Sequence, residues 1–100
     1  MEKRRPHHDL DAIQRGFTTV ASLRMTRTAQ DFALQQGWTA RDVVEIIWQI
    51  GREQFYKSMT SLQDASVWQD VYHVAWADAV LYVKFTTDPK GYLVVSLKWR

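Results

Sequence analysis

Apolar and polar residues alternate on both sides of a turn within residues 79–99. The turn is Asp88-Pro89-Lys90-Gly91. Pro89 presets φ for the second position of a type I turn, and Gly91 can adopt the left-handed conformation that closes a three-residue hairpin loop. The pattern therefore predicts two antiparallel strands in a single register. On the apolar face of this hairpin the predicted pairs are Phe85 with Val95, Val83 with Leu97, and Leu81 with Trp99.

The polar face of the same hairpin brings a phenol close to ammonium groups. The register places Tyr82 directly opposite Lys98, with Cβ atoms roughly 5 Å apart. Lys84 then lies opposite Ser96. A slip of one residue would mix the apolar and polar sets, so the turn and the pattern favour the same pairing. This face is interpreted either as a solvated sheet surface or as a functional surface.

The first half of the chain has the apolar spacing of helices. Apolar side chains within residues 10–17 fall on one face, and we expect a short helix that is capped by Asp9 or His8 and ends at Gly16. Residues 18–23 are β-branched and alternating, which predicts a short, weak strand.

Two further segments open with Thr followed three residues later by Asp, which is the spacing of a capping box. They begin at Thr28 and Thr39 and end at Gly37 and Gly51. The second of these helices is apolar around most of its circumference, which is typical of a core helix and not of one that contacts DNA bases. An αα-hairpin packed on a sheet is therefore favoured over a DNA-binding helix-turn-helix.

After Gly51 the pattern changes from helical to alternating. Residues 54–60 and 66–76 are predicted to be strands that precede the hairpin. Helices followed by a run of antiparallel strands indicate the α+β class. At 100 residues, we expect one domain spanning residues 1–100.

Composition limits the chemistry. The chain has no cysteine, which excludes disulfides and thiol catalysis, and its net charge is only +2, with the positive excess within residues 1–27. No apolar run has the length of a signal peptide or membrane span, so we expect a cytoplasmic protein without a membrane partner. His7 and His8 are adjacent and His73 is remote, and we expect neither a metal nor another cofactor.

The predicted sheet is rich in side chains that act on phosphate: Lys57, Gln69, His73, Tyr82, Lys84 and Lys98. Three ammonium groups on one face would attract a phosphate and lower one another's pKa, which a lysine needs to accept a proton near neutral pH. Because alternate residues of a strand share a face, Tyr82, Lys84 and Lys98 are expected on the same face of the hairpin. The same alternation leaves the facing of Lys57 and Gln69 ambiguous.

Several blocks of this sequence resemble the motility quorum-sensing regulator family. They are Met1-Glu2-Lys3-Arg4 with Pro6-His7, Phe55-Tyr56-Lys57-Ser58-Met59-Thr60, Trp68-Gln69-Asp70-Val71-Tyr72, Tyr82-x-Lys84, and Val94-Val95-Ser96-x-Lys98. The match runs in order along the whole chain and is looser between residues 12 and 54.

The resemblance implies a toxin of a type II toxin-antitoxin pair, with a curved antiparallel sheet packed against two or three helices as in RelE-type ribonucleases. It also implies metal-independent cleavage of single-stranded mRNA at GC-containing triplets such as GCU. A cognate antitoxin would be the protein partner, and DNA would be contacted only through the toxin-antitoxin complex. The residues that match the family's active site are Lys57, Gln69, Tyr82 and Lys98.

The expected reaction is attack of the ribose 2′-hydroxyl on the adjacent phosphate. We assign Lys57 as the first choice of base, Tyr82 as base or acid, Lys98 as stabiliser of the phosphate charge, and Gln69 as a positioning donor. Residues expected to bind substrate are Tyr56, His73, Lys84 and Ser96. Tyr56, Tyr72 and Trp76 are candidates for stacking on RNA bases.

The chain departs from the family at His73-Val74, where relatives carry an arginine followed by a proline. A titratable imidazole then replaces a permanently charged guanidinium. The alternative function is a non-catalytic RNA-binding domain, or a transcription-regulating interaction domain, that uses the same basic sheet face.

Overall fold

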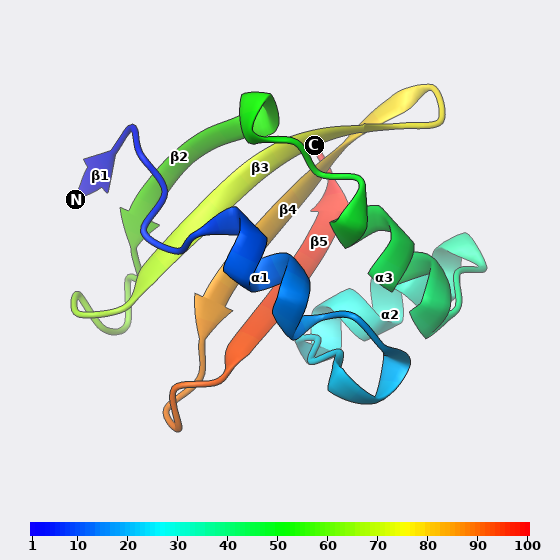
Figure 1. The fold of residues 1–100 in the computed structure, drawn as a ribbon, viewed down its shortest axis with the longest axis horizontal. Coiled ribbons are helices and arrows are strands. Elements are labelled where there is room, and N and C mark those ends of the chain that lie inside the picture. Colours follow the sequence, from blue (N-terminus) through cyan, green and yellow to red (C-terminus); the bar gives the residue numbers. More distant parts are fainter.

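The protein, described over residues 1–100 in a computed structural model, pairs an antiparallel sheet with three α-helices. The helices are α1 (Leu10–Gly16), α2 (Arg27–Gln36) and α3 (Ala40–Trp48). The strands are β1 (Glu2–Lys3), β2 (Phe55–Thr60), β3 (Trp68–Trp76), β4 (Ala79–Thr87) and β5 (Leu93–Trp99). Figure 1 shows these strands side by side in the order β1-β2-β3-β4-β5, with the helices gathered on one side. The predicted α+β class is confirmed.

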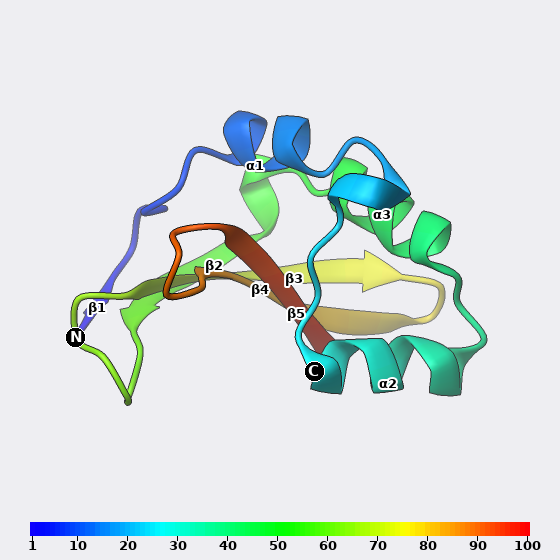
Figure 2. The same ribbon diagram turned by 90° about the horizontal axis from the view of Figure 1, so that it is seen from below.

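The two faces of the sheet have different coverings. Seen edge-on in Figure 2, α1 and α3 lie over one face, whereas α2 lies beside β5 and no helix covers the opposite face of β2–β4. The covered face supplies the core. Its buried side chains are Leu10, Ile13, Phe17, Ala29, Ala33, Val43, Ile46, Ile47, Ile50, Tyr72, Val74, Leu81, Val83, Phe85, Val95 and Leu97.

The C-terminal hairpin has the register that its sequence predicts. Phe85 pairs with Val95, and Tyr82 pairs with Lys98. Asp88 donates its backbone N–H to Tyr92 at 2.9 Å, and Gly91 has a φ of 87° in the left-handed region. Turn chemistry and alternation thus agree, as expected for a strand pair with one buried face.

Helix boundaries agree with the prediction except at the start of α2 and the end of α3. Helix α3 ends at Trp48 with Gln49 as its C-cap and not at Gly51, because Gly51 instead begins the 3-10 turn Arg52–Gln54 and donates its N–H to the Gln54 side chain. Asp9 caps α1 by accepting the N–H of Ala12, and the capping box of Thr39 opens α3. The cap of α2 is Thr26, whose hydroxyl accepts the N–H of Ala29 at 3.1 Å. The prediction of Thr28 as this cap is therefore wrong by two residues, because Thr26 is the residue with extended backbone at the helix start.

The predicted strand over residues 18–23 is wrong. Val20–Ser22 form one turn of 3-10 helix, closed by reciprocal bonds between Thr19 and Ser22. Side chains that bond the local backbone compete with strand pairing, and here they decide the local structure. The next residues do reach the sheet, because Val95 donates its N–H to Arg24 and accepts that of Thr26.

Candidate active site on the open sheet face

The open face of the sheet carries the predicted catalytic residues. β4 supplies Tyr82 and Lys84, and β5 supplies Lys98 opposite Tyr82 and Ser96 opposite Lys84. The Lys98 ammonium lies 5.1 Å from the centre of the Tyr82 ring. This is the phenol and ammonium pair predicted from the hairpin sequence.

Strand β3 adds Gln69 and His73 to the same face. His73 pairs with Tyr82 across β3 and β4, and Val71 pairs with Lys84. Gln69 has the same parity as these two residues of β3 and therefore shares their side. The ambiguity of Gln69 in the sequence is thus resolved in favour of the open face.

A β-bulge in β2 decides where Lys57 points. Phe55 pairs with Tyr72 on the covered face, but Lys57, two residues later, pairs with Val71 on the open face. The extra residue is Tyr56, and a bulge of this kind breaks the simple alternation of side chains. Tyr56 and Lys57 consequently lie on the same face, with the Lys57 ammonium 5.3 Å from the centre of the Tyr56 ring.

The aromatic side chains of this face stack on one another. The rings of Tyr56 and His73 are nearly parallel with centroids 4.2 Å apart, and His73 lies 5.9 Å from Tyr82. Tyr56 is exposed, so its outer surface is free to contact a ligand. Two other stacking candidates do not join it, because Tyr72 is fully buried on the covered face and Trp76 packs against Trp38.

The electrostatics of the lysines differ from the mutual lowering expected from sequence. Burial and the nearby Lys98 lower the pKa of Lys84. A hydrogen bond and charge attraction from Glu2 instead raise the pKa of Lys57. The Lys57 ammonium lies 3.1 Å from Oε2 of Glu2. Lys57 therefore carries its proton firmly while this pair is formed.

Two further groups titrate in this cluster. Burial raises the pKa of the Tyr82 phenol. Burial and the charge of Arg100 lower the pKa of His73, so its imidazole is neutral at neutral pH. Glu2 and Arg100 were both missed by the sequence analysis. The signal for Arg100 is its even spacing from Lys98, whereas Glu2 reaches Lys57 only through pairing across the fold.

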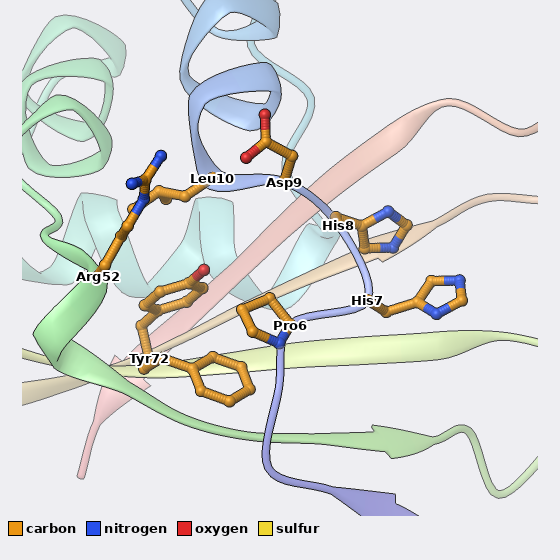
Figure 3. Close-up of a pocket in the computed structure, with 8 residues that line it drawn as sticks. Pro6, His7, His8, Asp9, Leu10, Arg52 and Tyr72 are labelled. Atoms are coloured by element: carbon orange, nitrogen blue, oxygen red, sulfur yellow. The ribbon is translucent and has the colours of Figure 1, made fainter.

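The largest cavity of the molecule lies elsewhere. It measures about 500 Å³ and is lined by residues of the covered side: Pro6, His7, His8, Asp9, Leu10, Arg52, Phe55 and Tyr72. Figure 3 shows the segment Pro6–Leu10 crossing in front of the strands, with the Tyr72 phenol directed toward Leu10 and Arg52. The side chains of Tyr72 and Lys57 lie on opposite faces of the sheet, so this cavity is separate from the cluster of Lys57, Tyr82 and Lys98.

A smaller hollow of about 320 Å³ adjoins the cluster at Gln69. Its other lining residues are Ser61, Gln63, Asp64, Val67, Thr86, Thr87, Asp88 and Pro89. Amide, hydroxyl and carboxylate groups predominate there. The open face thus combines a cationic centre with a neighbouring polar recess.

The chain is similar to known toxins over nearly its whole length. The model of the family described as "Motility quorum-sensing regulator, toxin of MqsA" matches residues 5–99. This chain belongs to the MqsR toxin family. The mRNA interferase toxin MqsR of Escherichia coli (strain K12) is 34% identical over 98 residues, which is 98% of each chain. The family resemblance predicted from the sequence blocks is confirmed.

The MqsR family match covers all strands of the open face from β2 to β5. It also begins before α1, so the segment that crosses the covered face is included. No helix of this chain combines the length and the apolar character that a membrane crossing requires.

Proposed function

We propose that this chain is an mRNA interferase toxin that cleaves single-stranded mRNA on the open face of its sheet. The observation that carries the proposal is the Tyr82–Lys98 pair, set among further cations on a face that no helix covers. The family and the name of the Escherichia coli relative support it. A fixed cluster of donors and positive charges is what a phosphodiester needs as charge develops in the transition state.

We propose internal transphosphorylation without a metal. The 2′-hydroxyl loses its proton, its oxygen forms a new bond to phosphorus, and the bond from phosphorus to the 5′-oxygen breaks. The departing oxygen takes up a proton. The products are a 2′,3′-cyclic phosphate and a 5′-hydroxyl end, so the site needs one proton acceptor, one proton donor and positive charge.

The protonation states support particular roles. Lys57 and Tyr82 both hold their protons at neutral pH, because Glu2 raises the pKa of Lys57 and burial raises that of Tyr82. We therefore assign Tyr82 as the donor to the 5′-oxygen. Lys57 and Lys98 stabilise the charge on the phosphate, and this revises our first choice of Lys57 as the base. Gln69 remains a positioning donor.

The surroundings of the cluster suit a single strand. Bases in A-form helices present poorly accessible edges, whereas unpaired bases can stack on aromatic rings. Tyr56, backed by His73, offers such a ring. The polar recess beside Gln69 offers hydrogen-bonding groups for a neighbouring base. We propose that Lys84 and Ser96 contact the backbone and that GC-containing triplets such as GCU are the preferred sites.

An antitoxin of the MqsA kind is the proposed protein partner, since the family is described as the toxin of MqsA. The edge of β5 is partly occupied by the bonds of Val95 to Arg24 and Thr26. The opposite edge ends in the two-residue strand β1. Contact with DNA is proposed only through the toxin-antitoxin complex.

Variants on the hairpin test this function. Tyr82→Phe removes the proposed proton donor and should slow cleavage of a single-stranded RNA by about 10² to 10⁴ under single-turnover conditions. Lys98→Met removes a charge that we assign to stabilising the phosphate and should also slow cleavage. Its matched control is Lys90→Met, which changes an exposed lysine at the hairpin tip and should leave the rate unchanged. RNA binding by Tyr82→Phe should persist.

Unchanged cleavage by Tyr82→Phe would contradict the assigned proton transfer. A wild-type chain that binds RNA in a salt-sensitive way, yet cuts neither free RNA nor ribosome-bound mRNA, would favour the non-catalytic RNA-binding alternative.

A further inference from the structure

The strand β1 brings a carboxylate to the proposed active site. Glu2 pairs with Met59 and Lys3 pairs with Ser58, and Thr60 donates its N–H to the Met1 carbonyl at 2.9 Å. Met59 lies on the open face, because it pairs with Gln69. Glu2 therefore projects to the same face as Lys57, and Figure 1 shows β1 alongside the end of β2.

A second attachment holds this segment in place. Asp70 is fully buried, and its carboxylate accepts the backbone N–H groups of His7 at 3.0 Å and His8 at 2.7 Å. The Ser58 hydroxyl donates to the same carboxylate at 2.6 Å. With β1 paired at one end and Asp70 bonded at the other, the position of Glu2 is fixed by the fold.

The Glu2 carboxylate is only partly used. Oε2 lies 3.1 Å from the Lys57 ammonium, and Oε1 accepts no hydrogen bond. The Glu2 side chain is 55% exposed, whereas that of Lys57 is 19% exposed. The other ion pair of the structure, between Arg52 and Asp11, lies away from this cluster. Glu2 is thus the carboxylate that forms an ion pair within the open face.

We propose that Glu2 is the catalytic residue that accepts the proton of the ribose 2′-hydroxyl. This inference rests on the proposed function and supplies the base that the function requires. Lys57 and Tyr82 hold protons at neutral pH, whereas Glu2 is a carboxylate on the open face with one oxygen that accepts no hydrogen bond. An ammonium has three donor hydrogens, so Lys57 can hold Glu2 and still bind a phosphate oxygen.

The proposed step balances without a further reactant. Oε1 of Glu2 takes the 2′-hydroxyl proton as the 2′-oxygen bonds to phosphorus. The bond to the 5′-oxygen breaks, and Tyr82 gives its proton to that oxygen. Glu2 then releases its proton to water, and Tyr82 regains one from water. The Lys57 ammonium stays charged throughout and neutralises the phosphate.

Glu2→Gln is the direct test, because it keeps the shape of the side chain and removes the proton acceptor. Cleavage should fall by about 10² to 10⁴, the effect expected for loss of a general base. The matched control Glu45→Gln makes the same change on the exposed side of α3 and should cleave at the wild-type rate. An unchanged thermal midpoint of Glu2→Gln would show that the fold is retained.

A modified RNA separates the base from the acid. When sulfur replaces the bridging 5′-oxygen, the leaving group needs no proton donor. Tyr82→Phe should then recover a rate close to wild type, whereas Glu2→Gln should stay slow on this substrate. A Glu2→Gln variant that the sulfur substrate also rescues would overturn the proposal, since Glu2 would then act at the leaving group through Lys57.

The outcomes also distinguish a failure of this inference from a failure of the proposed function. If wild type cuts RNA and Glu2→Gln cuts equally well, the inference fails while the proposed function stands. If His73→Gln cleaves slowly and the sulfur substrate does not restore its rate, whereas Glu2→Gln does not behave in this way, the base is His73 and the assignment is overturned. If wild type leaves both RNAs and ribosome-bound mRNA uncut, the proposed function itself fails.

Discussion

Asp70 holds the N-terminal segment through the backbone of His7 and His8, and the conservative substitution Asp70→Asn should release this segment. Its carboxylate is fully buried and accepts three hydrogen bonds, from His7, His8 and Ser58. Asp70→Asn replaces one of the two carboxylate oxygens by an NH₂ group. That group faces donors, so at least one of the three bonds is lost, and the remaining bonds lose the charge of the acceptor.

The cost follows from these bonds. A hydrogen bond to a charged group contributes about 1.5 to 3 kcal/mol and a neutral one about 0.5 to 1.5 kcal/mol, so one lost and two weakened bonds amount to roughly 3.5 to 6 kcal/mol. The carboxylate no longer has to be buried in its charged form, which offsets part of this loss. We expect Asp70→Asn to lower the free energy of unfolding by about 2 to 4 kcal/mol.

Urea unfolding followed by tryptophan fluorescence measures this difference. Hydrogen exchange at the amides of His7 and His8 should accelerate in the same variant, because these N–H groups lose their acceptor. Asp31→Asn makes the same change on an exposed face of α2 and is the control. A loss below about 0.5 kcal/mol, the usual range for a surface substitution, would refute the argument that Asp70 holds the segment.

Two further predictions concern the core and the pH dependence. Leu81 is fully buried on the covered face, and Leu81→Ala should lower the free energy of unfolding by about 2 to 5 kcal/mol in the same urea assay. A loss under about 1 kcal/mol would mean that the surrounding side chains fill the space left by the missing atoms. Burial and the charge of Arg100 lower the pKa of His73 from 6.5, so the unfolded chain binds this proton more readily than the folded chain does. The free energy of unfolding should therefore fall as the pH drops through 6.5 toward the lowered pKa. His73→Gln should therefore lose less stability than wild type between neutral and mildly acidic pH in parallel urea titrations, and equal losses would contradict the assigned pKa direction.

The sequence predicts best where two local signals agree. In the C-terminal hairpin the turn residues favour one loop geometry, and the alternation of apolar and polar residues fits one register. All the predicted pairs of this hairpin are present. The capping box of Thr39 is correct for the same reason, since cap and apolar spacing coincide. For residues 18–23 the alternation was the single signal for a strand, and hydrogen bonds of local side chains produced a 3-10 turn instead.

The sequence predicted only part of the arrangement of the candidate site residues. The hairpin register placed Tyr82, Lys84, Ser96 and Lys98 together. Lys57 could not be placed, because the bulge at Tyr56 is a property of pairing with β3 and leaves no mark in the alternation of β2. The Glu2–Lys57 pair joins residues 55 positions apart, and it reverses the expected direction of the Lys57 pKa.

The central claim is that the open face cuts RNA by transphosphorylation without a metal. The most direct measurement is cleavage of a defined single-stranded RNA, free and ribosome-bound, in the presence of EDTA by wild type and Lys57→Ala, with the chemistry of both new ends determined. The account predicts cuts at GC-containing triplets, with 2′,3′-cyclic phosphate and 5′-hydroxyl ends, that are lost in Lys57→Ala. Cuts that bear 5′-phosphates, or that need a divalent metal, would contradict it.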